Sequence, residues 1–358
     1  MNTTLLNKLV SIDSSNSNES QIGNALVSHL RKIGFSVSTQ LVETNRFNIF
    51  ASRGHASKSI LFYGHLDTVQ VAKGASWKTN PLTLTRKYDR LYGLGAYDMK
   101  GGIAAFLEAA KNSSVYTKIF LAIDEENISL GSWKAVTHNK PFFYDVSLVV
   151  SAEPNFDLGD ESVTVGRTGR FIFEIEFTGK AVHIAKYYNG IDAIALSSKF
   201  VQDFYKARKK LFKSQKTVGQ VRKTYAESNG MSVCDKSIVE VEILSGPSDT
   251  ITSCQQILEN LSHAKVRLKP RVAPYLSGYS FDSIPCENEI SRIIKKHTKK
   301  KMKKVARSSV GDDNVLATLR IPVITWGPSG GNAHSANEYV SEKSLDTFVN
   351  MYSDLLLK

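Results

Sequence analysis

Short apolar segments that alternate with a helical pattern constrain the fold of this chain more than any other feature of its sequence. Residues 59–63 (SILFY), 118–123 (KIFLAI) and 146–151 (VSLVVS) are mostly apolar and are bounded by turn residues. Such runs are typical of strands that are buried on both faces of a sheet. Residues 103–110 (IAAFLEAA), between the first two runs, favour a helix. The order strand, helix, strand predicts an α/β domain with a mostly parallel sheet.

A different pattern begins near Gly166. Phenylalanine and isoleucine alternate with glutamate over residues 171–177, which predicts a strand with one buried and one solvated face. Helical and strand patterns then follow in turn at residues 192–213, 218–227, 238–244, 251–263 and 265–269. The resulting order β-α-β-β-α-β is that of a ferredoxin-like module.

After Gly278 the α/β pattern returns, with a basic helix, a strand at 321–326 and a terminal helix from about Ser344. We therefore expect an α/β catalytic domain that is interrupted by an inserted α+β module. The expected limits are 1–164 and 278–358 for the catalytic domain, and 165–277 for a lid or dimerisation domain of ferredoxin-like fold.

The composition excludes several classes of protein. The chain has 358 residues, of which 42% are hydrophobic and 22% charged, which is an ordinary globular mixture. No apolar run approaches the ~20 residues that span a bilayer, and residues 1–15 lack the pattern of a secretory signal. Three cysteines without a CxxC pair argue against a disulfide framework and a zinc knuckle. We expect a cytoplasmic protein with no membrane contact.

Positive charge is in excess, with 46 Lys and Arg against 34 Asp and Glu, and it gathers in two groups at residues 206–216 and 295–304. One interpretation is a patch for nucleic acid or another anionic surface. The other is the solvated face of an amphipathic helix, since three isoleucines at helical spacing precede the second group. We favour the helix and expect no nucleic-acid partner, because the groups are far apart and match no nucleic-acid module.

Candidate site residues follow the predicted strands of the first domain, at the sheet edge where open α/β proteins bind ligands. His65 and Asp67 come directly after residues 59–63, so an extended backbone points both to one face. A carboxylate beside an imidazole commonly orients a metal-ligating histidine. A structural His–Asp pair is the alternative at this position.

Acidic residues follow the next strands. Asp98 precedes the helix at residue 103, so it either caps that helix or offers two oxygens to bridge two cations. Residues 124–126 (DEE) follow the strand at 118–123, and three adjacent acids repel one another unless cations or hydrogen-bond donors neutralise them. An exposed acidic turn is the alternative. Glu153 follows the strand at 146–151.

A last candidate, His334, lies in the loop after the strand at 321–326 and alone would be an ordinary loop histidine. Together, two histidines and several carboxylates emerge from five strand ends. Imidazole and oxygen ligands suit zinc, manganese or cobalt. A mixed set with a bridging aspartate suits a two-metal hydrolase.

The segments GHLDTV, GLGAYDMKGG, DEENISLGS, SAEP and GNAHSANEYV resemble, in this order, the motifs of the M20 metallopeptidase family. The resemblance runs over nearly the whole chain. It implies that His65, Asp98 and Glu153 hold one metal, and that Asp98, Glu126 and His334 hold the other. It also implies that Asp67 orients His65. Glu125 would be the general base, which takes a proton from the attacking water and passes it to the leaving amine.

The same resemblance implies a homodimer formed by the inserted module, in which a histidine stabilises the oxyanion in the partner's active site. His183, in the segment GKAVH, is the candidate. Three departures from the family concern the loop after Glu126 and the lid. Ile128 stands where many relatives have glycine. Leu244 stands nearest to the position where the family often has an arginine that grips the substrate carboxylate. Of the family's Asn-x-x-Pro segment, only Asn229-Gly230 remains.

We therefore expect a metal-dependent hydrolase of linear amide bonds with two divalent ions, zinc first and cobalt or manganese as alternatives. The expected reaction removes an N-acyl group from an amino acid, as deacetylases and desuccinylases of amino-acid biosynthesis do. A metallo-exopeptidase or dipeptidase acting on short peptides is the alternative within the family. A catalytically silent scaffold that binds anionic partners is a third hypothesis, and the complete set of ligands argues against it.

Overall fold

The computed structural model describes residues 3–15, 17–70, 76–111, 113, 115–156, 158–214 and 216–357. The chain divides into two compact units. Unit 1 comprises Met1–Gly166, Phe281–Ala306 and Gly311–Lys358, and unit 2 comprises Arg167–Ser280 and Arg307–Val310. The chain therefore leaves unit 1, builds most of unit 2, and returns to complete unit 1.

The central sheet of unit 1 has the strand order β1-β2-β6-β3-β7-β15-β8, and β14 also pairs with β8. Neighbours from β6 to β15 are parallel, whereas β1, β2 and β8 join the sheet through antiparallel pairs. The strands are β1 (Ser36–Glu43), β2 (Arg46–Arg53), β3 (Ser59–His65), β6 (Thr117–Ala122), β7 (Val146–Ser151), β8 (Ser162–Arg167), β14 (Lys303–Arg307) and β15 (Val323–Thr325). The predicted mostly parallel sheet is confirmed.

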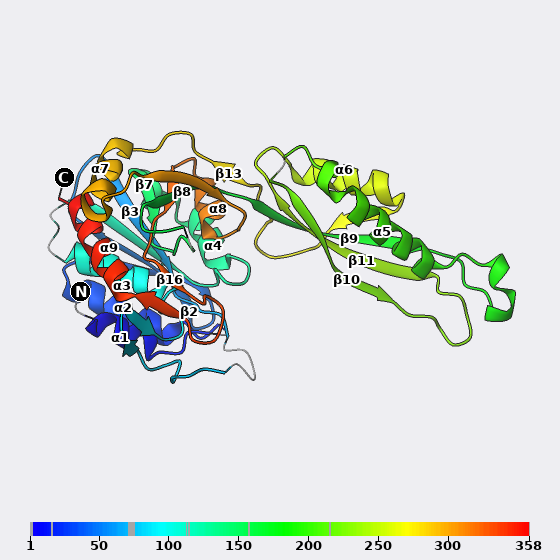
Figure 1. The fold of residues 1–358 in the computed structure, drawn as a ribbon, viewed down its shortest axis with the longest axis horizontal. Coiled ribbons are helices and arrows are strands. Elements are labelled where there is room, and N and C mark those ends of the chain that lie inside the picture. The colour runs from blue at the N-terminus through cyan, green and yellow to red at the C-terminus, as the bar shows by residue number, and fades with distance from the viewer. Residues whose placement is uncertain are drawn as a thin grey trace. The chain divides into compact units, whose positions relative to one another are not determined.

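Helices cover both faces of this sheet, which explains why its strands are apolar throughout. Figure 1 shows α3, α7 and α9 on one side and α4 and α8 on the other. Phe62 of β3 stacks on Phe106 of α3, whereas Phe120 of β6 contacts Phe143 on the opposite face. The helices are α1 (Thr4–Val10), α2 (Ser20–Lys32), α3 (Lys100–Ala110), α4 (Leu130–His138), the 3-10 helix η1 (Lys140–Phe143), α7 (Glu287–Thr298), α8 (Asp312–Ala317) and α9 (Glu342–Leu355).

A small second sheet in unit 1 joins two segments that are far apart in sequence. Its order is β16-β17-β5-β4, and its strands are β4 (Thr85–Lys87), β5 (Arg90–Tyr92), β16 (Gly330–Gly331) and β17 (Tyr339–Ser341). Tyr339 pairs with Tyr92 in antiparallel register. This pairing places the residues before β17 beside those after β5.

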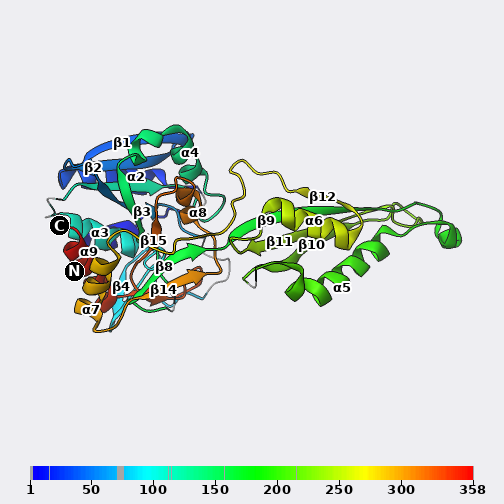
Figure 2. The same ribbon diagram turned by 90° about the horizontal axis from the view of Figure 1, so that it is seen from above.

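Unit 2 has the predicted ferredoxin-like arrangement (Figures 1 and 2). Its elements are β9 (Gly169–Thr178), the 3-10 helix η2 (Ile184–Asn189), α5 (Ala193–Leu211), β10 (Val218–Ala226), β11 (Lys236–Ser245), α6 (Ile251–Ser262), β12 (Lys265–Leu268) and the short β13 (Tyr279–Ser280). The sheet order is β10-β11-β9-β12, with antiparallel pairs. Phe200 and Phe204 of α5 pack with Phe173 of β9 in its core. The alternation at 171–177 thus marks a strand with one face on this core.

The lysine-rich segment differs from the prediction. α7 ends at Thr298, because Lys299 has a left-handed backbone with φ of 62°, and Lys303 already belongs to β14. The prediction that the helix continues through residue 304 is therefore wrong. Lys300 and Lys303 each lie 3.2 Å from a carboxylate oxygen of buried Glu161, so part of this charge is compensated within unit 1.

Within the described residues, no helix is both long and apolar enough to cross a membrane.

Candidate metal centre

The parallel strands of unit 1 bring the chemically active segments to one edge of the sheet. β3 ends at His65, β6 ends at Ala122 just before the acids at 124–126, and β7 ends at Ser151 just before Glu153. Because parallel strands end at the same edge, these side chains converge there. The loop between β5 and α3 adds Asp98 to them.

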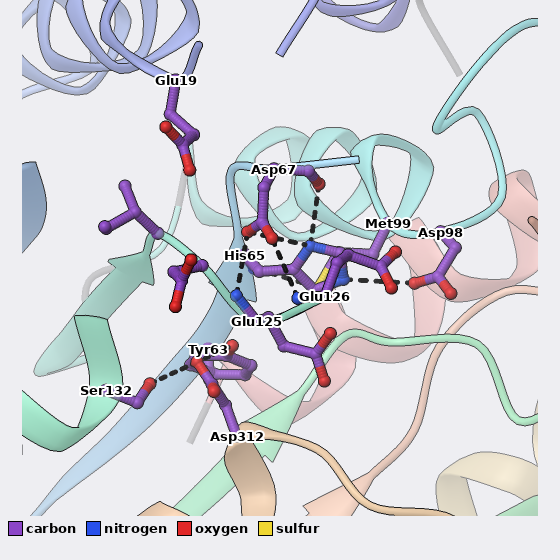
Figure 3. Close-up of polar contacts among 12 residues, drawn as sticks. Glu19, Tyr63, His65, Asp67, Asp98, Met99, Glu125, Glu126, Ser132 and Asp312 are labelled. Atoms are coloured by element: carbon purple, nitrogen blue, oxygen red, sulfur yellow. Dashed lines mark hydrogen bonds and ion pairs between the residues drawn. The ribbon is translucent and has the colours of Figure 1, made fainter. Parts of the chain in front are cut away.

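Asp98 lies between two imidazoles at the centre of this group (Figure 3 shows His65 and Asp98). His65 Nε2 lies 3.2 Å from Asp98 Oδ1, and His334 Nε2 lies 3.2 Å from Asp98 Oδ2. His334 Nε2 is also 3.1 Å from Glu126 Oε1. The alternative role of Asp98 as a helix cap is contradicted, because Met99 occupies the N-cap position of α3 and no side chain caps it.

Two groups of side chains could each hold a metal ion. One consists of His65, Glu125 and Glu153, and the other of His65, Asp98 and Glu126, with ligand atoms within 4.8 Å of one another in each group. The contacts of His334 with Asp98 and Glu126 extend the second group. Extended in this way, the two groups contain six of the eight predicted site residues.

The electrostatics of the site fit a bound cation. Burial and the nearby carboxylate of Glu153 raise the pKa of Glu125 well above its ordinary value. Hydrogen bonds to Asp98 and Glu126 raise the pKa of His334 to about 10. Carboxylates crowded in a buried site repel one another, and divalent ions relieve this repulsion. Imidazole nitrogens and carboxylate oxygens directed at one point are the donor set that zinc, cobalt and manganese accept.

Asp67 holds the acidic loop after β6. Its two carboxylate oxygens accept hydrogen bonds from the backbone N–H groups of Glu125 (3.2 Å) and Glu126 (2.9 Å), as Figure 3 shows. Its backbone oxygen lies 3.0 Å from Nδ1 of His65, and its carboxylate lies 3.7 Å from the same atom. Burial raises the pKa of Asp67 to about 7. Asp67 thus contacts both the imidazole and the loop that bears the acids.

The first of the three adjacent acids, Asp124, has structural contacts instead. Its Oδ1 lies 3.2 Å from the guanidinium of Arg46, and its Oδ2 accepts a hydrogen bond from the N–H of Leu130 at 3.2 Å. Arg46 also binds buried Glu19. Asp124 is therefore neutralised by a cation of the protein, whereas Glu125 and Glu126 are directed toward the group around Asp98.

Two further buried acids were missed by sequence reasoning. Asp312, at the start of α8, accepts hydrogen bonds from Tyr63 (2.6 Å) and Ser132. Glu338 accepts hydrogen bonds from the backbone N–H groups of the loop that carries Asp98. Glu338 lies inside the motif GNAHSANEYV, which was the available signal, whereas Asp312 lies in none of the motifs.

The predicted lid residues lie in unit 2. His183 is exposed, and its Nδ1 accepts a hydrogen bond from the N–H of Ala185 at 3.2 Å, which caps η2. Two residues before Leu244, Glu242 contacts the guanidinium groups of Arg170 (2.5 Å) and Arg222 (3.4 Å). Near Leu244, β11 thus presents an acid flanked by two arginines.

Comparison with known proteins shows the family to which this chain is related. Residues 61–358 match the profile of peptidase family M20/M25/M40. The chain is 25% identical to a succinyl-diaminopimelate desuccinylase of Coxiella burnetii, with 97% of this chain and 96% of the relative covered. It is 25% identical to an acetylornithine deacetylase of Buchnera aphidicola, with 93% and 90% covered.

Solved structures share the fold. A tripeptidase from Staphylococcus aureus superposes with a TM-score of 0.79 at 18% identity, covering 98% of this chain and 96% of that one. A dinuclear metal-binding peptidase from Bacillus subtilis superposes with a TM-score of 0.73 at 15% identity, covering 98% and 95%.

Proposed function

The chain belongs to peptidase family M20/M25/M40 and is a hydrolase that acts on amide bonds, and from this premise we propose that it is a two-metal amidohydrolase. In this proposal it removes an N-acyl group from an amino acid, as a deacetylase or desuccinylase of amino-acid biosynthesis. The relatives with these printed names match over more than nine-tenths of this chain, which supports the proposal.

One observation carries the proposal: Asp98 has an imidazole nitrogen 3.2 Å from each of its two oxygens. A carboxylate with both oxygens directed toward separate histidines suits a bridge between two cations. We assign His65, Asp98 and Glu153 to one metal, and Asp98, Glu126 and His334 to the other. Zinc is the proposed ion, with cobalt and manganese as alternatives, because all three accept this donor set.

The divalent ions would polarise the scissile carbonyl and lower the pKa of the attacking water. The protein's own residues then handle the protons. Glu125 is partly buried and lies just after the carboxyl end of β6, where it takes a proton from water and returns it to the leaving amine. Asp67 holds the backbone of Glu125 and Glu126 through two hydrogen bonds, so the base and the ligand keep a fixed spacing.

An exopeptidase or dipeptidase is the alternative within the same family. A solved structure that shares the fold is a tripeptidase, and this likeness supports the alternative. Both alternatives use the same metal centre, and they differ in the substrate that it hydrolyses.

We also propose a cytoplasmic homodimer formed through unit 2. Its edge strand β10 is largely exposed, and unpaired edge strands readily pair with a second copy. In such a dimer, His183 would stabilise the oxyanion in the partner's site. Turnover lowered in His183→Ala with unchanged metal content would support this role, and loss of bound metal would contradict it.

A hydrolysis panel on the purified protein with added Zn²⁺ or Co²⁺ tests the proposal. The panel compares N-acetylornithine, N-succinyl-diaminopimelate and other N-acyl amino acids with simple dipeptides, and Glu125→Ala serves as the control. We expect turnover of one acyl amino acid, absent in the variant. Cleavage of dipeptides alone would support the exopeptidase, and no turnover despite two bound metals would contradict both substrate assignments.

A further inference from the structure

Glu338 is a buried carboxylate that binds the loop carrying Asp98. Its side chain is 1% exposed. One oxygen, Oε1, accepts hydrogen bonds from the N–H groups of Tyr97 (2.9 Å) and Asp98 (3.0 Å), and Oε2 accepts one from Gly95 (2.9 Å). The backbone oxygen of Glu338 accepts a fourth from Gly93 at 3.0 Å. A single residue therefore binds four N–H groups of one short loop.

The position of Glu338 follows from the small sheet of unit 1. Glu338 directly precedes β17, and the loop from Gly93 to Asp98 directly follows β5, the strand that pairs with β17. His334 lies four residues before Glu338 on the same irregular segment. The side chain of Asn332 donates a hydrogen bond to the backbone oxygen of Asn337 at 3.0 Å, which closes this segment. Glu338 thus links the segment of His334 to the loop of Asp98.

Two other candidate ligands, His65 and Glu153, are held differently. His65 is the last residue of β3, and Glu153 follows the neighbouring strand β7 by two residues. The two strands are paired over several residues of parallel register. The backbone of the main sheet therefore fixes His65 and Glu153, whereas His334 depends on a loop segment and on its contacts.

We propose that Glu338 is a positioning residue that sets the distance between Asp98 and His334. The affinity for the metal held by Asp98, Glu126 and His334 then depends on Glu338 more than the affinity for the metal held by His65, Asp98 and Glu153 does. This inference rests on the proposed two-metal function. Charge-assisted hydrogen bonds from three N–H groups are strong and directional, which suits the carboxylate to this task. Supporting residues of this kind commonly change metal affinity by about 10–100-fold when mutated.

The test compares Glu338→Gln and Glu338→Asp with the wild type. Gln keeps the size but replaces one acceptor oxygen with an N–H donor, and Asp keeps the charge but is one methylene shorter. Glu342→Gln is the matched control, because Glu342 lies four residues later and contacts Arg86 at the surface (2.6 Å). The full chain is freed of metal and then titrated with Co²⁺. Calorimetry and the visible spectrum of the bound ion monitor the binding.

We expect two Co²⁺ ions in the wild type and in Glu342→Gln. In both Glu338 variants, we expect one ion to bind with an affinity within about threefold of the wild type and the other at least about 10-fold more weakly. The weaker ion should show an altered visible spectrum. At saturating Co²⁺, turnover should recover most of its wild-type value, because the groups that perform the chemistry remain.

Three outcomes would overturn the inference: unchanged affinity for both ions, an equal loss of affinity for both ions, or variants that fail to fold even with Co²⁺. The last outcome would indicate that Glu338 has a general structural role. Circular dichroism and the melting temperature of the metal-free proteins distinguish the last case. A wild type that binds fewer than two ions would instead contradict the proposed function, and the inference would fall with it.

Discussion

The acids at the sheet edge of unit 1 and the acids on the sheet of unit 2 have different partners. In unit 2, Glu240 pairs with Lys269, and Glu242 lies between Arg170 and Arg222. At the edge of unit 1, the partners of Asp98 and Glu126 are imidazoles. Both sheets carry clustered glutamates, but lysine and arginine neutralise one set and histidine contacts the other.

This difference indicates where the protein needs an external cation. A carboxylate beside a guanidinium or ammonium group is compensated within the fold, so such pairs neither need nor attract a metal. Neutral histidine donates a nitrogen lone pair to a cation, and crowded buried carboxylates favour one. The type of partner, rather than the number of acids, separates the candidate metal centre from an ordinary charged surface.

Removal of metal should have the largest effect on activity, and its effect on backbone hydrogen exchange should be confined to unit 1. Treatment with a chelator should lower amide hydrolysis at least about 1,000-fold, because the ions supply several kcal/mol of transition-state stabilisation. Exchange of backbone amide hydrogens, measured by mass spectrometry, should become faster in segments 93–98, 124–130 and 332–338. It should stay unchanged in β9 and β11 of unit 2. Zn²⁺ or Co²⁺ should reverse both effects, and equal changes in the two units would break the comparison.

Substitution of a buried acid that already has protein partners should cost stability. Asp312→Ala removes the acceptor for the hydroxyl groups of Tyr63 and Ser132. Because these groups remain buried, we expect the free energy of unfolding to fall by about 2–4 kcal/mol, measured by chemical denaturation. Asp282→Ala, at an exposed position of unit 1, is the control. A loss no greater than that of the control would contradict the structural role of Asp312.

The smallest effect is expected for the charge pairs of unit 2. Glu242→Gln weakens partly exposed contacts with Arg170 and Arg222, whose side chains are 31% and 32% exposed. We expect the free energy of unfolding to change by less than about 1 kcal/mol, and metal content to stay the same. Denaturation and elemental analysis measure the two quantities. A loss of bound metal in this variant would show that the acids of the two units are not independent.

The strands that bring the site together could be predicted because burial on both faces leaves a continuous apolar run. The runs at 59–63, 118–123 and 146–151 correspond to β3, β6 and β7 within two residues. The alternation at 171–177 likewise marked β9, because one of its faces packs on α5 and α6. Long or strongly patterned segments therefore revealed their structure.

Short elements and loop contacts could not be predicted in this way. β5, β16 and β17 have two or three residues each, which is too short for any periodicity, yet they bring His334 close to Asp98. The end of α7 depends on a left-handed Lys299 and on the pairing of later lysines with Glu161. The partners of Glu338 are backbone N–H groups, which every residue except proline has, so no side-chain pattern indicates them.

The pairing of β15 with β7 has a consequence for how the protein is made. Val323 pairs with Val149, and the residues of unit 2 lie between them in the chain. A ribosome releases β3, β6 and β7 first and then a nearly continuous unit 2, whose strands can pair while one edge of β7 still lacks its neighbour. An unpaired strand edge is a site of aggregation, so we expect the nascent chain to be most vulnerable during this interval. His334 and Glu338 emerge later than β15, so the side chains of the candidate metal centre are all present only after this interval.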